Sequence, residues 1–95
     1  MKLQIIGGGK MGEALLGGML SQGWAPAEEL AVVELDAQRR QQFGETYPGV
    51  VVRDNPLPAV DAMIAVKPQY VVEVAATLSE LKVDRILSVL SLIHI

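Results

Sequence analysis

The sequence contains no cysteine, which removes several kinds of chemistry at once. Disulfide bonds, thiolate zinc sites and cysteine nucleophiles are all excluded. Histidine occurs once, at His94 in an apolar tail, where no neighbour could orient it for catalysis. No cluster of His, Asp and Glu has the spacing of metal ligands, so we expect no metal site. The absence of cysteine also fits a cytoplasmic protein, because disulfides are rare in that compartment.

Basic runs and long apolar runs are missing as well. The 95 residues carry 8 Lys and Arg against 11 Asp and Glu, a net charge of −3. Nucleic acids and anionic membranes are bound through clustered positive charge, so we expect neither as a partner. No apolar stretch approaches the ~20 residues that span a bilayer, and the N-terminus has no signal-peptide pattern.

The composition is that of one small globular domain. Hydrophobic residues make up 51% of the chain and mean hydropathy is +0.34, which is too apolar for intrinsic disorder. A chain of this length forms one domain at most. Any phosphate that it binds must be held by backbone groups and a few side chains.

A glycine motif follows the first apolar run. Residues 3–6 predict a buried strand, and Gly7, Gly9 and Gly12 after it have the spacing G-x-G-x-x-G. In a dinucleotide-binding fold the first glycine allows a tight turn and the second lets a pyrophosphate approach the backbone. The third lets the next helix pack close to the sheet. The N-terminus of that helix, predicted over residues 13–22, would bind phosphate through its free N–H groups and its dipole.

Strands and helices alternate along the rest of the chain. Further strands are predicted at 30–33, 50–52, 62–66 and 86–89, and further helices at 37–43 and 69–81. Each strand is a continuous apolar run, which is typical of a parallel sheet covered on both faces. The predicted fold class is therefore α/β, a Rossmann-like doubly wound parallel sheet that stops after about five strands.

Several single residues add local predictions. Gly23 is expected to end the first helix and Asp36 to cap the second. Gly17 and Gly18 lie inside a helix, where they suggest close packing on a sheet or a ligand. Three large side chains are expected to be packed: Met11, Met19 and Trp24.

Several motifs together resemble pyrroline-5-carboxylate reductase, the last enzyme of proline synthesis. The glycine turn reads Gly7-Gly8-Gly9-Lys10-Met11 and continues into the helix segment Glu13-Ala14-Leu15-Leu16-Gly17-Gly18. An Asp54-Asn55 pair follows the third strand, and Ala65-Val66-Lys67-Pro68-Gln69 closes the fourth. The resemblance spans residues 1 to about 88. It covers only the front, cofactor-binding part of a whole family member.

The resemblance implies a cofactor site for NADP or NAD. Residues 6–11, which are Ile6, Gly7, Gly8, Gly9, Lys10 and Met11, would surround the pyrophosphate. Glu34 and Asn55 would approach the adenosine ribose. The nicotinamide side would be lined by Ala65, Val66, Lys67 and Pro68. The implied reaction is reduction of 1-pyrroline-5-carboxylate to proline. It implies no assignment of a catalytic residue.

The choice between the two cofactors stays open at this point. Glu34 lies 22 residues after Gly12, close to the ~20-residue spacing of an acid that bonds a ribose 2′-OH and repels a 2′-phosphate. Arg39 and Arg40 act in the opposite sense if they reach that phosphate, and a solvated helix face is an equally good interpretation of them. Lys10 is as readily solvated as bound to phosphate, and Lys67 is interpreted as part of a turn.

The chain departs from the family pattern in two places. Pro56 and Pro58 leave little room for a helix between the third and fourth strands. After Val89 the family continues with a small-residue glycine turn and a helical domain, whereas this sequence ends in an apolar tail. We therefore expect residues 1–95 to be a partial dinucleotide-binding domain without the C-terminal dimerisation and substrate domain. Such a fragment would be inactive alone, and its full-length parent would be a homo-oligomer.

Two alternative functions remain. One is another Rossmann oxidoreductase, of the hydroxyacid-dehydrogenase or coenzyme-F420-dependent kind, against which residues 65–69 argue. The other is a non-catalytic module that senses NAD or NADP.

Overall fold

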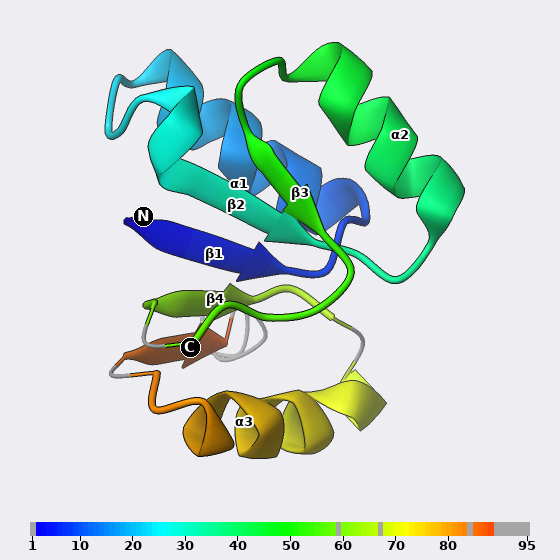
Figure 1. Ribbon diagram of the computed structural model, residues 1–95, viewed down its shortest axis with the longest axis vertical. Helices are drawn as coiled ribbons and strands as arrows, with labels where there is room; N and C mark the ends of the chain where they lie inside the picture. The colour runs from blue at the N-terminus through cyan, green and yellow to red at the C-terminus, as the bar shows by residue number, and fades with distance from the viewer. Residues whose placement is uncertain (1, 59, 67, 84, 89–95) are drawn as a thin grey trace.

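Five parallel strands form one sheet among the residues that the computed structural model describes, which are 2–58, 60–66, 68–83 and 85–88. The strands are β1 (Leu3–Ile6), β2 (Leu30–Val33), β3 (Val51–Arg53), β4 (Ala62–Ile64) and β5 (Ile86–Ser88). Their order across the sheet is β3-β2-β1-β4-β5 (Figure 1). The strand order reverses between β1 and β4, as in doubly wound dinucleotide-binding folds. The predicted fold class is confirmed.

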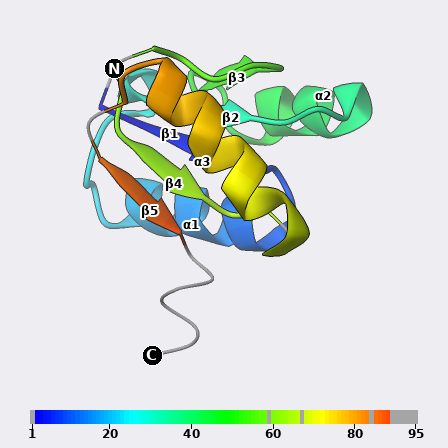
Figure 2. The ribbon, with the colours of Figure 1, turned by 90° about the horizontal axis from the view of Figure 1, so that it is seen from below.

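Helices cover both faces of the sheet. Helices α1 (Lys10–Ser21) and α2 (Ala37–Thr46) lie on one face, and α3 (Val71–Glu80) lies on the other (Figures 1 and 2). Each face has its own core. The core under α1 and α2 contains Leu3, Ile5, Leu16, Leu30, Val32 and Phe43, and the core under α3 contains Ile6, Val33, Ile64 and Leu78. Side chains of β1 therefore alternate between the two cores.

The helix boundaries differ from the predicted ones by a few residues. Helix α1 begins at Lys10 and not at 13, so the glycine turn leads directly into it. It ends as predicted before Gly23, which has φ +66°, and the Gly23 and Trp24 N–H groups donate to the Leu20 and Met19 carbonyls at 3.2 and 3.0 Å. This is a Schellman motif. Asp36 caps α2 as predicted, since its side chain accepts from Gln38 N at 2.9 Å.

The crossover from β3 to β4 contains no helix in its described residues, 54–58 and 60–61, as its prolines predict. A side chain of β1 holds this loop instead. Gln4 is fully buried, and its Nε2 donates to the Leu57 and Val60 carbonyls at 2.9 and 3.0 Å. Its Oε1 accepts from Leu57 N at 2.8 Å. The Gln4 side-chain amide thus provides hydrogen-bond partners for backbone groups of the loop, which in a crossover helix would bond to one another.

Some packing predictions are wrong. Met11 and Trp24 are 44% and 45% exposed, although the Lys2 ammonium lies 4.2 Å from the centre of the Trp24 ring. Gly17 contacts only the Tyr47 hydroxyl, 3.7 Å from where its Cβ would be, and Gly18 has no described atom within 4 Å of that position. The buried residues of α1 are Gly12 and Leu16, and Met19 packs against the same core as predicted.

Two short 3-10 turns complete the described part. They are η1 (Ala27–Glu29), before β2, and η2 (Pro68–Tyr70), before α3. None of the described helices is long and apolar enough to cross a membrane.

Candidate dinucleotide-binding site

Close backbone contact explains two glycines of the turn after β1. Gly7 has φ +107°, and a Cβ there would lie 2.7 Å from the Ala65 carbonyl oxygen. A Cβ at Gly12 would lie 2.0 Å from the Gly7 carbonyl oxygen. No side chain fits in either place, so the turn and the approach of α1 to the sheet both require glycine.

Gly9 differs from both, because no described atom lies within 4 Å of where its Cβ would be. It is the N-cap residue of α1, and no side chain caps this helix end. The first N–H groups of a helix have no partner within the helix and carry its positive dipole end. An exposed, uncapped helix start beside a residue without a side chain has the shape and polarity that phosphate requires.

Lys10 and Met11 belong to the first turn of α1, not to the loop before it. The implied pyrophosphate site, residues 6–11, therefore combines the end of β1, the turn and the first residues of α1. The turn itself is Gly7–Gly8–Gly9, and both Lys10 and Met11 are exposed. Their backbone N–H groups belong to the first turn of α1, where N–H groups have no partner within the helix.

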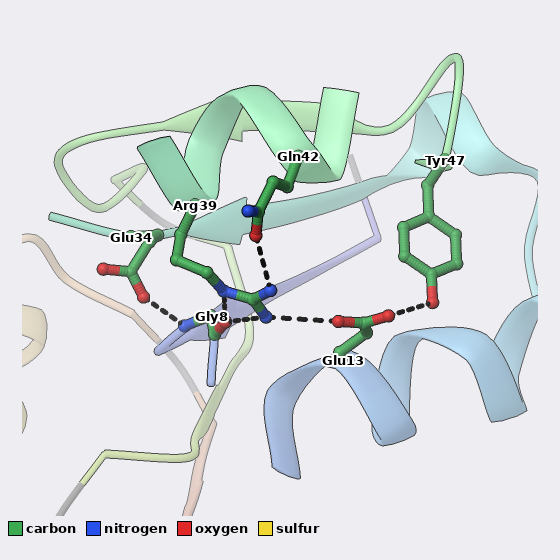
Figure 3. Close-up of polar contacts among 6 residues, drawn as sticks. All are labelled: Gly8, Glu13, Glu34, Arg39, Gln42 and Tyr47. Carbon is green, nitrogen blue, oxygen red and sulfur yellow. Dashed lines mark hydrogen bonds and ion pairs between the residues drawn. The ribbon is translucent and has the colours of Figure 1, made fainter. Parts of the chain in front are cut away.

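The Gly8 peptide is held from both sides by side chains that follow β2 (Figure 3). Gly8 N donates to Glu34 Oε1 at 2.8 Å, and Glu34 Oε2 accepts from Asp36 N at 2.8 Å. Arg39 Nε donates to the Gly8 carbonyl at 2.8 Å, and Arg39 Nη2 donates to the same oxygen. The glycine turn is therefore fixed to the end of β2 and to α2.

The same network continues to α1 and to the end of α2. Arg39 Nη2 lies 3.2 Å from Glu13 Oε1, and the Tyr47 hydroxyl donates to Glu13 Oε2 at 3.0 Å (Figure 3). Burial raises the pKa of Tyr47 above its ordinary 10.0, and the hydrogen bond to Glu13 and the charge of that carboxylate raise it further. Sequence reasoning did not identify Glu13 or Tyr47. Glu13 lies 26 positions before Arg39 and 34 positions before Tyr47, and no local motif connects residues so far apart.

A cleft of about 490 Å³ opens at the carboxyl ends of β1, β2 and β4. Ligands of open α/β sheets bind at this place, where the strand order reverses. Four of the predicted site residues line it: Ile6, Gly7, Glu34 and Val66. Leu35, Asp54, Pro56, Tyr70 and Glu73 are among the others. Leu35 is 85% exposed, so an apolar surface borders the cleft beside Glu34.

The remaining predicted residues lie around this cleft. Ala65 N donates to the Ile6 carbonyl at 2.8 Å, which ties the end of β4 to the end of β1. Asn55 is exposed and its Oδ1 accepts from Arg53 Nη2 at 3.2 Å, so it stands outside the cleft between two lining residues. Pro68 begins η2. Lys67 and His94 lie outside the described residues.

A larger hollow, of about 730 Å³, lies elsewhere on the molecule. It runs between α1 and strands β1, β4 and β5, and Leu15, Met19 and Met63 contribute to its apolar lining. No residue of the glycine turn lines it, so its size does not make it the candidate site. Among the described residues no group of three His, Asp or Glu could hold a metal ion.

The features at the smaller cleft fit a dinucleotide. The turn needs glycine at two positions, the helix start is open, and an acid ends β2. With the strand order, these features define a Rossmann-like dinucleotide-binding domain. The chain belongs to the family described as NADP oxidoreductase, coenzyme F420-dependent, whose model matches residues 2–91. It is therefore a member of a family of oxidoreductases that use a nicotinamide dinucleotide.

Two curated relatives are pyrroline-5-carboxylate reductases. The chain is 30% identical over 80 residues to the protein of Corynebacterium melassecola, and 35% identical over 81 residues to that of Haemophilus influenzae. In each case the match covers 81% of this chain and 29% of the relative. The similarity to this group, predicted from the glycine turn and residues 65–69, is confirmed.

Proposed function

We propose that this chain is the dinucleotide-binding part of a pyrroline-5-carboxylate reductase. In that role it holds NADH or NADPH for the reduction of the C=N bond of 1-pyrroline-5-carboxylate to give proline. Because the match covers 29% of each relative, the proposal gives this chain the cofactor-binding share of the reaction. Substrate binding and subunit contacts are assigned to a longer, homo-oligomeric parent.

The observation that carries the proposal is the contrast between the glycines of one turn. Gly7 and Gly12 are closed in by backbone atoms, whereas Gly9 faces open space at an uncapped helix start. A turn with a purely structural role would require glycine at 7 and 12 but not at 9. A bound pyrophosphate needs all three.

Each part of the site has a task in this proposal. The α1 N-terminus neutralises the pyrophosphate, and Glu34 accepts hydrogen bonds from the adenosine ribose. Ala65 and Val66 border the nicotinamide side and exclude water from it. When bound, the nicotinamide supplies the hydride, and the chain contributes orientation and electrostatics.

The first test measures nucleotide binding to the full 95-residue chain. Two-dimensional NMR is used to monitor it, because this method also detects weak binding. NADH or NADPH should shift the amide signals of residues 7–12, and reduced coenzyme F420 should not shift them. Gly9→Ala should weaken binding about tenfold or more, because a methyl group would stand against the phosphate. Gly18→Ala is the matched control, since its Cβ also meets open space but lies away from the turn. If neither nucleotide shifts these signals, the proposal is wrong.

The substrate needs a separate experiment. Residues 2–88 would replace the matched segment of the Haemophilus influenzae relative, and oxidation of NADH and NADPH would be followed with several substrates. We expect turnover with 1-pyrroline-5-carboxylate and none with 3-hydroxy acids. A chimera that folds and binds nucleotide but works only with coenzyme F420 would assign the chain to the activity that its family description names. Nucleotide binding without any turnover would favour a sensing module.

A further inference from the structure

The carboxylate of Glu34 is fixed at the end of β2. One oxygen accepts from Gly8 N and the other from Asp36 N, both at 2.8 Å. Two backbone donors on one carboxylate leave it little freedom to rotate away from an incoming ligand. Its remaining lone pairs still accept hydrogen bonds, as a pair of ribose hydroxyls would require.

The arginines nearest to this carboxylate are already engaged. All three guanidinium nitrogens of Arg39 have partners, namely the Gly8 carbonyl, Glu13 Oε1 and Gln42 Oε1. Its guanidinium also lies 4.8 Å from the centre of the Phe43 ring. Arg40 Nη1 donates to the carbonyls of Glu34 and Leu35, both at 2.8 Å. Both side chains serve the protein's own backbone, which corrects the interpretation of a solvated helix face.

The charges that line the cleft all have one sign among the described residues. Glu34, Asp54 and Glu73 contribute carboxylates, and no described Lys or Arg lines it. Arg53, on the neighbouring β3, is bound to Asn55 through Nε and Nη2 at 3.1 and 3.2 Å. An additional phosphate on the ribose would therefore meet the negative charge of these three carboxylates, whereas the nearby Arg39, Arg40 and Arg53 donate to other groups of the chain.

We infer that this cleft selects NADH over NADPH and that Glu34 is the residue that determines the choice. The inference rests on the proposed function, because it concerns the same dinucleotide site. The family description names NADP, so the preference comes from this chain's own contacts. Arg39 acts as a positioning residue for the glycine turn, and its bonds to Gly8 and Glu13 keep it from serving a 2′-phosphate.

Dissociation constants for NADH and NADPH, measured on the full chain by NMR titration, test the inference. NADH should bind about tenfold more tightly or better, since the free-energy difference of one charge-assisted hydrogen bond corresponds to that ratio. Glu34→Gln should reduce the ratio towards one while preserving the side-chain shape. Glu28→Gln removes an exposed carboxylate from η1, before β2, and should leave the ratio unchanged.

Two further measurements keep the inference testable if Glu34→Gln does not fold. Raising the salt concentration should bring the two dissociation constants of the unaltered chain closer together, because salt screens the repulsion of the 2′-phosphate. Glu13→Ala leaves both bonds from Arg39 to the Gly8 carbonyl in place, so it should leave the ratio of the two dissociation constants unchanged. Equal or tighter binding of NADPH by the unaltered chain would overturn the inference and leave the proposed function standing. Binding of neither nucleotide would overturn both.

Discussion

Arg39 donates two hydrogen bonds to the carbonyl oxygen of Gly8, which lies 31 positions earlier in the chain. The other side of the same residue is held by Glu34, which accepts from Gly8 N. The glycine turn is thus supported by residues on both sides of the β2–α2 connection. Its geometry depends on α2 as much as on its own sequence.

Arg39→Met should destabilise the fold by about 1–3 kcal/mol, because the buried Gly8 carbonyl loses its partners. The ion pair with Glu13 is half-exposed and contributes at most about 1 kcal/mol of this. Urea unfolding gives the loss directly. Arg53→Met is the control: its contacts are with exposed Asn55, so a change within about 0.5 kcal/mol is expected. Equal losses in the two variants would show that the Gly8 bonds contribute nothing special.

Gly7→Ala should cost about 3 kcal/mol or more, since it combines a positive φ with a methyl group against the Ala65 carbonyl. Gly23→Ala separates the two causes. It has φ +66° but open space for the methyl group, so only the backbone strain of about 1–2 kcal/mol remains. Thermal unfolding of both variants provides the comparison. Similar losses would mean that the contact with Ala65 relaxes without cost.

Gln4→Leu should destabilise the fold by about 2–3 kcal/mol, because it leaves buried backbone groups of the β3–β4 loop without partners. The effect should be local as well as global. Hydrogen exchange of the Leu57 amide, which donates to Gln4 Oε1, should accelerate more than that of amides in β2. Gln41→Leu, on the exposed side of α2, should leave this amide's exchange rate unchanged. Unaltered exchange at Leu57 in the Gln4 variant would contradict the assignment of this role to Gln4.

Stability above pH 10 should depend on Tyr47. Its pKa is raised in the folded state by burial and then by Glu13, so the folded chain keeps the phenol proton longer than the unfolded chain does. The resulting stabilisation is complete below the unfolded pKa of 10.0 and is lost as the pH rises through the folded value. Tyr47→Phe removes this dependence. Urea unfolding between pH 8 and 11 should show that the free energy of unfolding falls more steeply with pH for the unaltered chain than for Tyr47→Phe. The same pH dependence in both chains would contradict this prediction.

Sequence reasoning predicted what depends on local chemistry. The strands are apolar runs, Asp36 has the residue type of a helix cap, and Gly23 that of a helix end. The parallel, doubly wound sheet followed from the alternation of strands and helices, whereas the order of its strands came from the structure. The start of α1 was missed by three residues because glycines at 9 and 12 are poor helix formers. Tertiary packing of Gly12 against Gly7 overrides that propensity.

The contacts that join distant residues were not predictable in the same way. Arg39 has the appearance of a surface residue in a polar helix, and nothing in its neighbourhood indicates a bond to Gly8. Gln4 interrupts an apolar strand, yet its partners at 57 and 60 become visible only when β4 lies beside β1. Gly18 was misjudged for the converse reason, because a helical glycine without a neighbour has no sequence signature. These contacts arise from the topology, which local patterns determine only in outline.

The position of β1 has a consequence for the order of folding events. Leu3 pairs with Leu30 on one side, whereas Gln4 pairs with Ala62 on the other. Closing the shorter loop costs less chain entropy, so the β1–α1–β2 unit should assemble first. Stopped-flow chevron plots should then show that Leu16→Ala, beneath α1, slows folding, whereas Gln4→Leu mainly accelerates unfolding. The amide of Gln4 would form its hydrogen bonds only after the folding transition state. The central strand β1 would therefore pair with β2 early in folding and with β4 late.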